Sequence, residues 1–69
     1  MTPEQQEILR VFQRLNHEIR WPTAKWLCSD LTEIIDSVVG LRIVELISLG
    51  FLEQGPGGWI SLTNKGMSA

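Results

Sequence analysis

The most regular hydrophobic pattern of the chain begins after residue 35. Apolar side chains follow one another at spacings of four, three and one residues, and they are Val39, Ile43, Leu46 and Ile47. These spacings place the four side chains on one side of a helix. Gly50 closes the stripe, and glycine readily takes the left-handed conformation that commonly ends a helix. The pattern predicts a helix over about residues 36–49.

A hairpin is expected directly after this helix. Phe51 and Leu52 begin an apolar, extended segment, Gly55–Gly58 supplies a turn of Gly and Pro, and Trp59–Leu62 forms a second strand. Only three residues follow Gly66, so no further element is expected beyond the hairpin.

The N-terminal residues predict another amphipathic helix. Thr2, Pro3 and Gln5 form a capping-box pattern with proline at the first helical position. An apolar stripe then continues through residues spaced four, three and four apart, with two more at its margins: Ile8, Phe12, Leu15 and Ile19, then Leu9 and Val11. Trp21-Pro22 is expected to end this helix, because proline disfavours helical geometry in the residue before it. Arg20-Trp21 can add a short edge strand to the hairpin.

A shorter helix is expected between these two. Thr23 can cap it, and its inward side chains would be Ala24, Leu27 and Leu31. The segment 32–34 is the candidate turn before the long helix, which Asp36 or Ser37 can cap. Two helices joined by a short turn, the second one longer, form a helix-turn-helix unit.

The amino-acid composition and net charge limit the kinds of partner that the chain is expected to bind. The 69 residues are 43% hydrophobic and 20% charged, which suits a single small globular domain over residues 1–69. Six Lys and Arg stand against eight Asp and Glu, for a net charge of −2, whereas nucleic-acid-binding modules usually have a basic surface. One cysteine, no apolar run long enough to cross a bilayer and no secretion signal lead us to expect a cytoplasmic protein without membrane contact.

The order helix, short strand, helix, turn, helix and hairpin resembles the winged helix-turn-helix superfamily, as found in bacterial and phage repressors. The residues that carry the resemblance are the stripe above, Leu49-Gly50-Phe51-Leu52 after it, and Leu62-Thr63-x-x-Gly66 after the hairpin. Ile34 fits the apolar turn residue of that pattern, while Glu33 stands where the superfamily often has glycine. The implied fold class is α+β, with three helices and a two- or three-stranded antiparallel wing.

The resemblance implies a small DNA-binding transcriptional regulator, which we expect to act as a homodimer on double-stranded DNA. Helix 36–49 would lie in the major groove, with Arg42 as the first choice for a base or phosphate contact and Leu41 against a thymine methyl group. Lys25 and Lys65 would approach phosphates, and Ser37 would contact the groove or only cap its helix. Each of these cations also has an ordinary reading as a solvated or ion-paired surface side chain.

A rival interpretation is a winged helix that binds a protein partner and not DNA. The expected outward side of helix 36–49 holds Ser37, Leu41, Val44, Glu45 and Ser48, with Arg42 on its flank, so it is poor in positive charge. Leu41 and Val44 lie one helical turn apart, and Trp59 is expected on the far face of the hairpin; together these three could dock a partner. An assembly role in a larger machine is a third alternative.

Catalysis, metal binding and cofactors find no support in the sequence. His17 and Cys28 are the only residues of their types, and neither has a partner from which to build a nucleophilic or zinc site. The segment Gly55–Gly58 opens no helix, so it is a turn and not a phosphate-binding loop.

Overall fold

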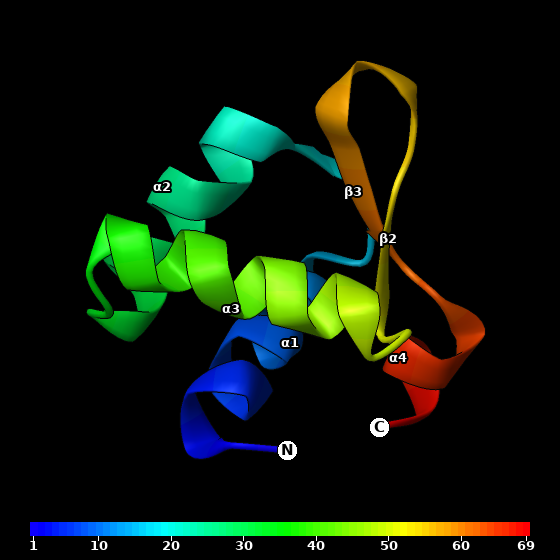
Figure 1. Cartoon of the computed structure of the whole chain (residues 1–69), viewed down its shortest axis with the longest axis horizontal. Coiled ribbons are helices and arrows are strands. Elements are labelled where there is room, and N and C mark those ends of the chain that lie inside the picture. Colours follow the sequence, from blue (N-terminus) through cyan, green and yellow to red (C-terminus); the bar gives the residue numbers. More distant parts are fainter.

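The computed structural model describes all residues, 1–69, and is a small α+β domain. Its helices are α1 (Pro3–Leu15), α2 (Trp21–Thr32), α3 (Asp36–Ser48) and α4 (Asn64–Ser68). Its strands are β1 (Ile19–Arg20), β2 (Leu52–Gln54) and β3 (Trp59–Leu62), and a 3-10 turn, η1 (Pro56–Gly58), forms the hairpin tip. In Figure 1, α3 lies across the front of the molecule, α1 lies behind and below it, α2 lies above, and the hairpin rises beside the C-terminal half of α3.

The three strands form one antiparallel sheet in the order β1-β3-β2. Leu52 pairs with Leu62 across the hairpin, and Ile19 pairs with Ile60 on the other side of β3. The expected hairpin and the expected edge strand are both present, with the edge strand one residue earlier than the sequence indicated. The sheet thereby joins the segment after α1 to the segment after α3.

One hydrophobic core lies between the sheet and the first three helices. The stripe predicted for α3 is confirmed, because Val39, Ile43 and Leu46 have no exposed surface. The other members of the core come from every remaining element except α4 and η1: Ile8, Leu9, Val11, Phe12, Ile19, Ala24, Cys28, Leu52 and Ile60. Burying each large aliphatic or aromatic side chain contributes about 1.5–3 kcal/mol, so this cluster holds α3 against α1 and α2.

The predicted end of the first helix is wrong. The helix stops at Leu15, because Asn16 takes the left-handed conformation (φ 54°) and its N–H donates to Phe12 O. Asparagine tolerates this conformation better than most residues. Ile19 therefore lies in β1, where it is buried against β3. Its spacing of four residues from Leu15 fits a helix but does not arise from one.

Trp21-Pro22 begins a helix instead of ending one. Proline lacks an N–H, but the first turn of a helix has no intrahelical acceptor for that N–H, so Pro22 fits at the start of α2. Thr23 consequently lies inside the helix and is not its cap. Ala24 is buried as expected, whereas Leu31 is 54% exposed near the helix end and does not face inward.

The turn between α2 and α3 depends on Glu33. This residue takes the left-handed conformation (φ 62°), which glycine adopts with less strain than a residue that has a side chain. The Ser29 hydroxyl donates to Ile34 O and holds the turn from the α2 side. The N-cap of α3 is Ile35, so neither Asp36 nor Ser37 caps the helix as the sequence suggested.

A fourth helix, which the sequence did not predict, follows the hairpin. The Thr63 hydroxyl accepts from Gly66 N–H, which caps α4, and donates to Gly50 O at the end of α3. Gly66 is buried against the backbone of Phe51. The Leu-Thr-x-x-Gly segment thus has a structural role, since it holds the N-terminal end of α4 against the turn between α3 and β2.

Candidate functional site

One side of α3 is turned away from the core and is exposed along its whole length. Its residues are spaced four, three and four apart and form a continuous strip, Ser37, Leu41, Val44 and Ser48, which we call the outer face of α3. Leu41 and Val44 keep 60% and 55% of their surface exposed. The outer face therefore presents two aliphatic side chains and two hydroxyls, without any charge.

Arg42 lies on the α1 side of α3 and not on the outer face. Its Nε is 2.9 Å from Glu4 Oε1, and its terminal nitrogen is 2.8 Å from Glu45 Oε2. Hydrogen bonds from Arg42 to Glu4 and Glu45 raise the pKa of the guanidinium, so it stays charged and paired. The side chain that the sequence made the first choice for DNA contact is thus engaged inside its own chain.

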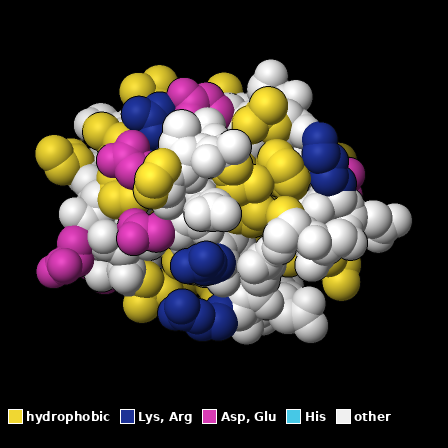
Figure 2. All heavy atoms as spheres, turned by 90° about the horizontal axis from the view of Figure 1, so that it is seen from below, with side chains coloured by type: hydrophobic (Ala, Val, Ile, Leu, Met, Phe, Trp, Pro, Cys, Tyr) yellow, Lys and Arg dark blue, Asp and Glu magenta, His cyan; other side chains and the backbone are white.

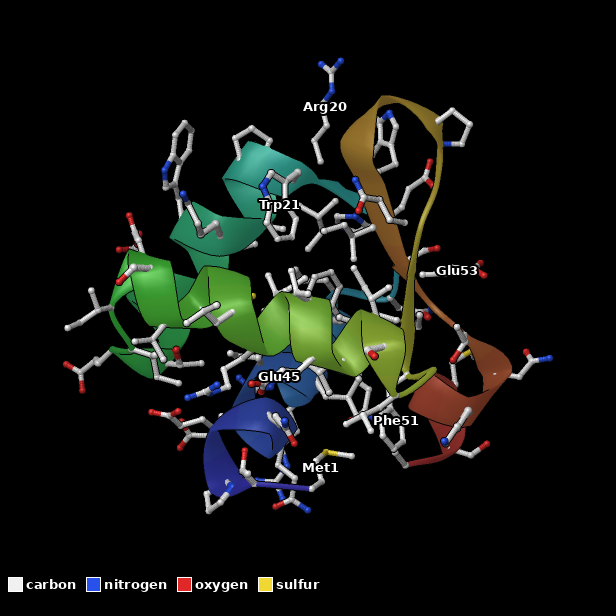
Figure 3. All side chains as sticks on the ribbon, viewed as in Figure 1. Met1, Arg20, Trp21, Glu45, Phe51 and Glu53 are labelled. Atoms are coloured by element: carbon white, nitrogen blue, oxygen red, sulfur yellow. The ribbon has the colours of Figure 1, made fainter.

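Glu45 completes this cluster on the α1 side. Its other carboxylate oxygen accepts a hydrogen bond from Gln5 Nε2 at 2.7 Å, and Figure 3 shows it at the lower margin of α3, facing α1. The hydrogen bond from Gln5 and the pairing with Arg42 hold the pKa of Glu45 below its ordinary value. The expected position of Glu45 on the outward side is therefore wrong, and its charge does not reach the outer face.

Lys65 also interacts within the chain. Its Nζ donates to Leu49 O at 2.8 Å and lies 4.7 Å from the centre of the Phe51 ring. A cation that binds the last carbonyls of a helix stabilises the negative end of the helix dipole. Lys65 thus caps α3 at the end opposite Ser37.

Lys25 is the predicted phosphate ligand that stays nearest the outer face. Its aliphatic stem packs over Gly40 of α3, where an added Cβ would lie 3.6 Å from Lys25 Cδ. The ammonium group forms no ion pair, because the only salt bridges of the chain are those of Arg42. Lys25 is therefore a cation between α2 and α3 that is free to bind an external anion.

Arg20 is a second available cation, and the sequence reading overlooked it. It is exposed in β1 directly opposite Trp59 of β3, and its guanidinium carbon lies 5.7 Å from the centre of the indole. Figure 3 shows Arg20 pointing away from the body of the molecule beside the hairpin. The expected edge strand at Arg20-Trp21 was the signal that could have placed this arginine next to the hairpin.

The tryptophans have three different environments. Trp21 packs half-buried on the core, Trp26 is 58% exposed on α2, and Trp59 is 38% exposed. Trp59 is partly covered by Arg20 on β1 and by Gly57 of the hairpin tip. Trp59 therefore stays available to a partner only over part of its surface.

The remaining basic residues, Arg10 and Arg14, line one hollow between α1 and the end of α2, together with Glu7. Figure 2 shows the face that includes α1, where several Lys and Arg side chains have Asp or Glu side chains beside them. The chain has no group of three His, Cys, Asp or Glu residues that could hold a metal ion. Its two hollows are small, with volumes of about 150 and 210 Å³.

Cys28 is fully buried, and burial raises the pKa of its thiol to about 11. The neutral thiol is a poor nucleophile, so this residue acts as a small core side chain.

Comparison of the chain with protein-family models, with curated proteins and with solved structures finds no match. None of its helices combines the length and apolar character needed to cross a bilayer.

Proposed function

We propose that this chain is a winged helix-turn-helix domain that binds double-stranded DNA, with α3 as the recognition helix and the β2–β3 hairpin as the wing. The observation that carries the proposal is the placement of α3. It follows α2 after a three-residue turn, is uncovered along its outer face, and has the hairpin beside its C-terminal half. Proteins of one fold can have different functions, so DNA binding also depends on the charges around α3.

Two cations are available for phosphates. Lys25 lies against α3, Arg20 lies beside the tip of the hairpin, and neither is paired with a carboxylate. Arg42 is paired with two carboxylates of its own chain, so it leaves the set of expected DNA ligands, whereas Lys65 keeps its charge but binds Leu49 O at the C-terminal end of α3. Two phosphate contacts per copy predict a slope of log K against log salt of about −2, which is about a tenfold loss of affinity between 50 and 200 mM salt.

Base contacts would come from the outer face of α3. Ser37 can exchange a hydrogen bond with a base edge, while Leu41 and Val44 can contact thymine methyl groups. No bidentate Arg, Lys, Asn or Gln is present on this strip. We therefore expect low sequence discrimination from one copy and a preference for sites that contain thymine.

The test is fluorescence anisotropy with a pool of short random duplexes at low ionic strength. Lys25→Ala and Arg20→Ala should each weaken binding and each reduce the salt slope by about one. Arg10→Ala, an exposed arginine on α1, is the matched control and should change neither quantity. Absence of binding at low salt, or binding that ignores salt, would rule out DNA as the partner.

A second candidate is favoured by one specific observation. The outer face of α3 has no charge, and its two most prominent side chains, Leu41 and Val44, are aliphatic. Such a strip is typical of a protein contact, in which Trp59 would join as an aromatic anchor. In that case Leu41→Asp abolishes binding of the protein partner, and Lys25→Ala leaves the affinity for that partner unchanged. The association also persists at high salt.

A further inference from the structure

A second apolar surface lies at the lower margin of the molecule, away from the outer face of α3. Leu49, just after α3, is 46% exposed, Phe51 is half-buried, and Met1 is 50% exposed. Figure 3 shows Met1 and Phe51 below the C-terminal half of α3, and Figure 2 shows hydrophobic side chains gathered in the middle of this face. We call Leu49 and Phe51, with Met1 beside them, the Leu49 patch.

Opposite charges lie on the two sides of the Leu49 patch. On one side, the carboxylates of Glu4 and Glu45 share the single guanidinium of Arg42, which leaves one negative charge. On the other side, Lys65 binds Leu49 O and has no carboxylate partner, which leaves one positive charge. A helix rises 1.5 Å per residue, so Leu49 lies about 6 Å beyond Glu45 and about 10 Å beyond Arg42 along α3.

We propose that this face joins two copies of the chain in a two-fold homodimer, with the Leu49 patches in contact at the axis. A two-fold axis through the patch exchanges its two charged sides. Lys65 of each copy then lies opposite the Glu4–Glu45–Arg42 cluster of the other copy, and the two α3 helices run antiparallel. The face is thus self-complementary: opposite charges meet on both sides of the axis, and apolar side chains meet at its centre.

The size of the face agrees with a reversible dimer. The backbone extends over 26 × 26 × 20 Å, so a face of 26 × 20 Å can bury at most about 500 Å² per copy, or about 1,000 Å² in total, which is the lower end of specific interfaces. A dimer of this kind should dissociate at micromolar concentrations.

This dimer leaves the outer face of α3 free. In Figure 1, α3 lies at the front of the molecule, whereas Met1 and Phe51 lie below α3 in Figure 3, so an axis from front to back turns both copies of α3 to the same side. The inference does not depend on the proposed DNA binding, although the arrangement would allow two copies to meet one duplex.

The first test is sedimentation velocity of the full chain without DNA, over about 1 to 300 µM, which spans the dissociation constants expected for an interface of this size. The wild-type chain should change from monomer to dimer within this range. Leu49→Glu should raise the dissociation constant at least tenfold. Leu41→Glu is the matched control, since it puts the same charge on an exposed leucine of the same helix, and it should leave the dissociation constant unchanged.

The second test exchanges the charges. Lys65→Glu alone and Glu4→Lys alone should each weaken the homodimer, because like charges then face each other on both sides of the axis. An equal mixture of the two variants should form a heterodimer, since opposite charges are restored on both sides. Circular dichroism melts of each variant report whether it is folded, and the mixture decides the matter even where Leu49→Glu unfolds.

The proposal is overturned by a chain that stays monomeric throughout the concentration range. It is also overturned by a dimer that Leu41→Glu disrupts, which would move the interface to the outer face of α3, or by a mixture that associates no better than its components.

Discussion

Replacement of Gly66 by alanine tests how α4 is fastened to the fold. An added Cβ at Gly66 would lie inside van der Waals contact of Phe51 O, 2.9 Å from Phe51 C and 3.0 Å from Leu62 Cδ2. Two of these three atoms belong to the backbone, which cannot rotate away as the end of a side chain can. The alanine therefore has to displace α4 or deform the turn after α3.

The cost can be worked out from the bonds that α4 would lose. If α4 moves away, three hydrogen bonds to the rest of the chain are lost: Gln13 Nε2 to Gly66 O (2.8 Å), Gln13 Nε2 to Ala69 O (3.2 Å) and Lys65 Nζ to Leu49 O (2.8 Å). At about 0.5–1.5 kcal/mol each, they total roughly 3 kcal/mol. Alanine has a better helix propensity than glycine by about 1 kcal/mol, so the net loss of unfolding free energy should be about 2 kcal/mol.

Gly40→Ala is the matched control. Gly40 lies inside α3, and its added Cβ would meet Lys25 Cδ at 3.6 Å, an ordinary contact with a flexible side chain. This substitution should therefore raise the free energy of unfolding by about 0.5–1 kcal/mol. The same chemical change thus has opposite signs at the two glycines.

Urea unfolding followed by tryptophan fluorescence, at one fixed protein concentration, measures both effects. For a chain of this length, about 2 kcal/mol corresponds to a fall in melting temperature of roughly 8–16 °C. A Gly66→Ala chain within about 0.5 kcal/mol of wild type, a margin typical of surface substitutions, would show that the close approach of Gly66 to Phe51 has no energetic weight. Equal destabilisation by Gly40→Ala would refute the reasoning from Cβ contacts.

Three further predictions concern single side chains. The Cys28 thiol, with its pKa raised to about 11 by burial, should react with a thiol reagent at pH 8 only as fast as the chain opens, and a rate equal to that of the urea-unfolded chain would contradict its burial. The pKa of Glu45 is depressed from its ordinary 4.5, so its stabilising contribution is present above pH 4.5 and is lost as the pH falls through the lower folded value. The free energy of unfolding of Glu45→Gln should therefore depend less on pH in that window. If the variant loses stability in acid as the wild type does, the cluster does not cause the acid dependence. Glu33→Gly should raise the free energy of unfolding by about 0.5–1 kcal/mol in a urea titration, because glycine adopts φ 62° without strain, and a destabilised variant would place the strain of the turn elsewhere.

The hydrophobic period, the capping box at Thr2 and the turn glycines were sufficient to predict the start of α1, the core side of α3 and the hairpin. The α3 stripe, the left-handed Gly50, the hairpin and the capping box at Thr2 all follow from local rules, and all are present in the structure. The prediction failed where two local readings compete. Ile19 continues a helical spacing and also suits a strand, and only its pairing with Ile60 decides between them.

The candidate site was less predictable than the fold, because availability of a charge depends on neighbours that are distant in sequence. Arg42 could be placed on α3 from its position alone, but its partner Glu4 lies 38 residues away and becomes adjacent only when α1 packs on α3. Lys65 likewise donates to Leu49 O, which lies 16 residues away in the sequence. Conversely, Arg20 gains its position beside Trp59 through strand pairing.

The sequence by itself determined the start of α1, the buried stripe of α3 and the hairpin after Gly50, since these depend on side-chain period, capping and glycine within a few residues; the end of α1, the start of α2 and α4 did not follow from it. Tertiary structure alone decided which charges remain available and which apolar side chains stay exposed, because ion pairing and burial arise only when separate elements meet. That difference removes Arg42 from the candidate DNA ligands, adds Arg20, and places opposite charges on the two sides of Leu49.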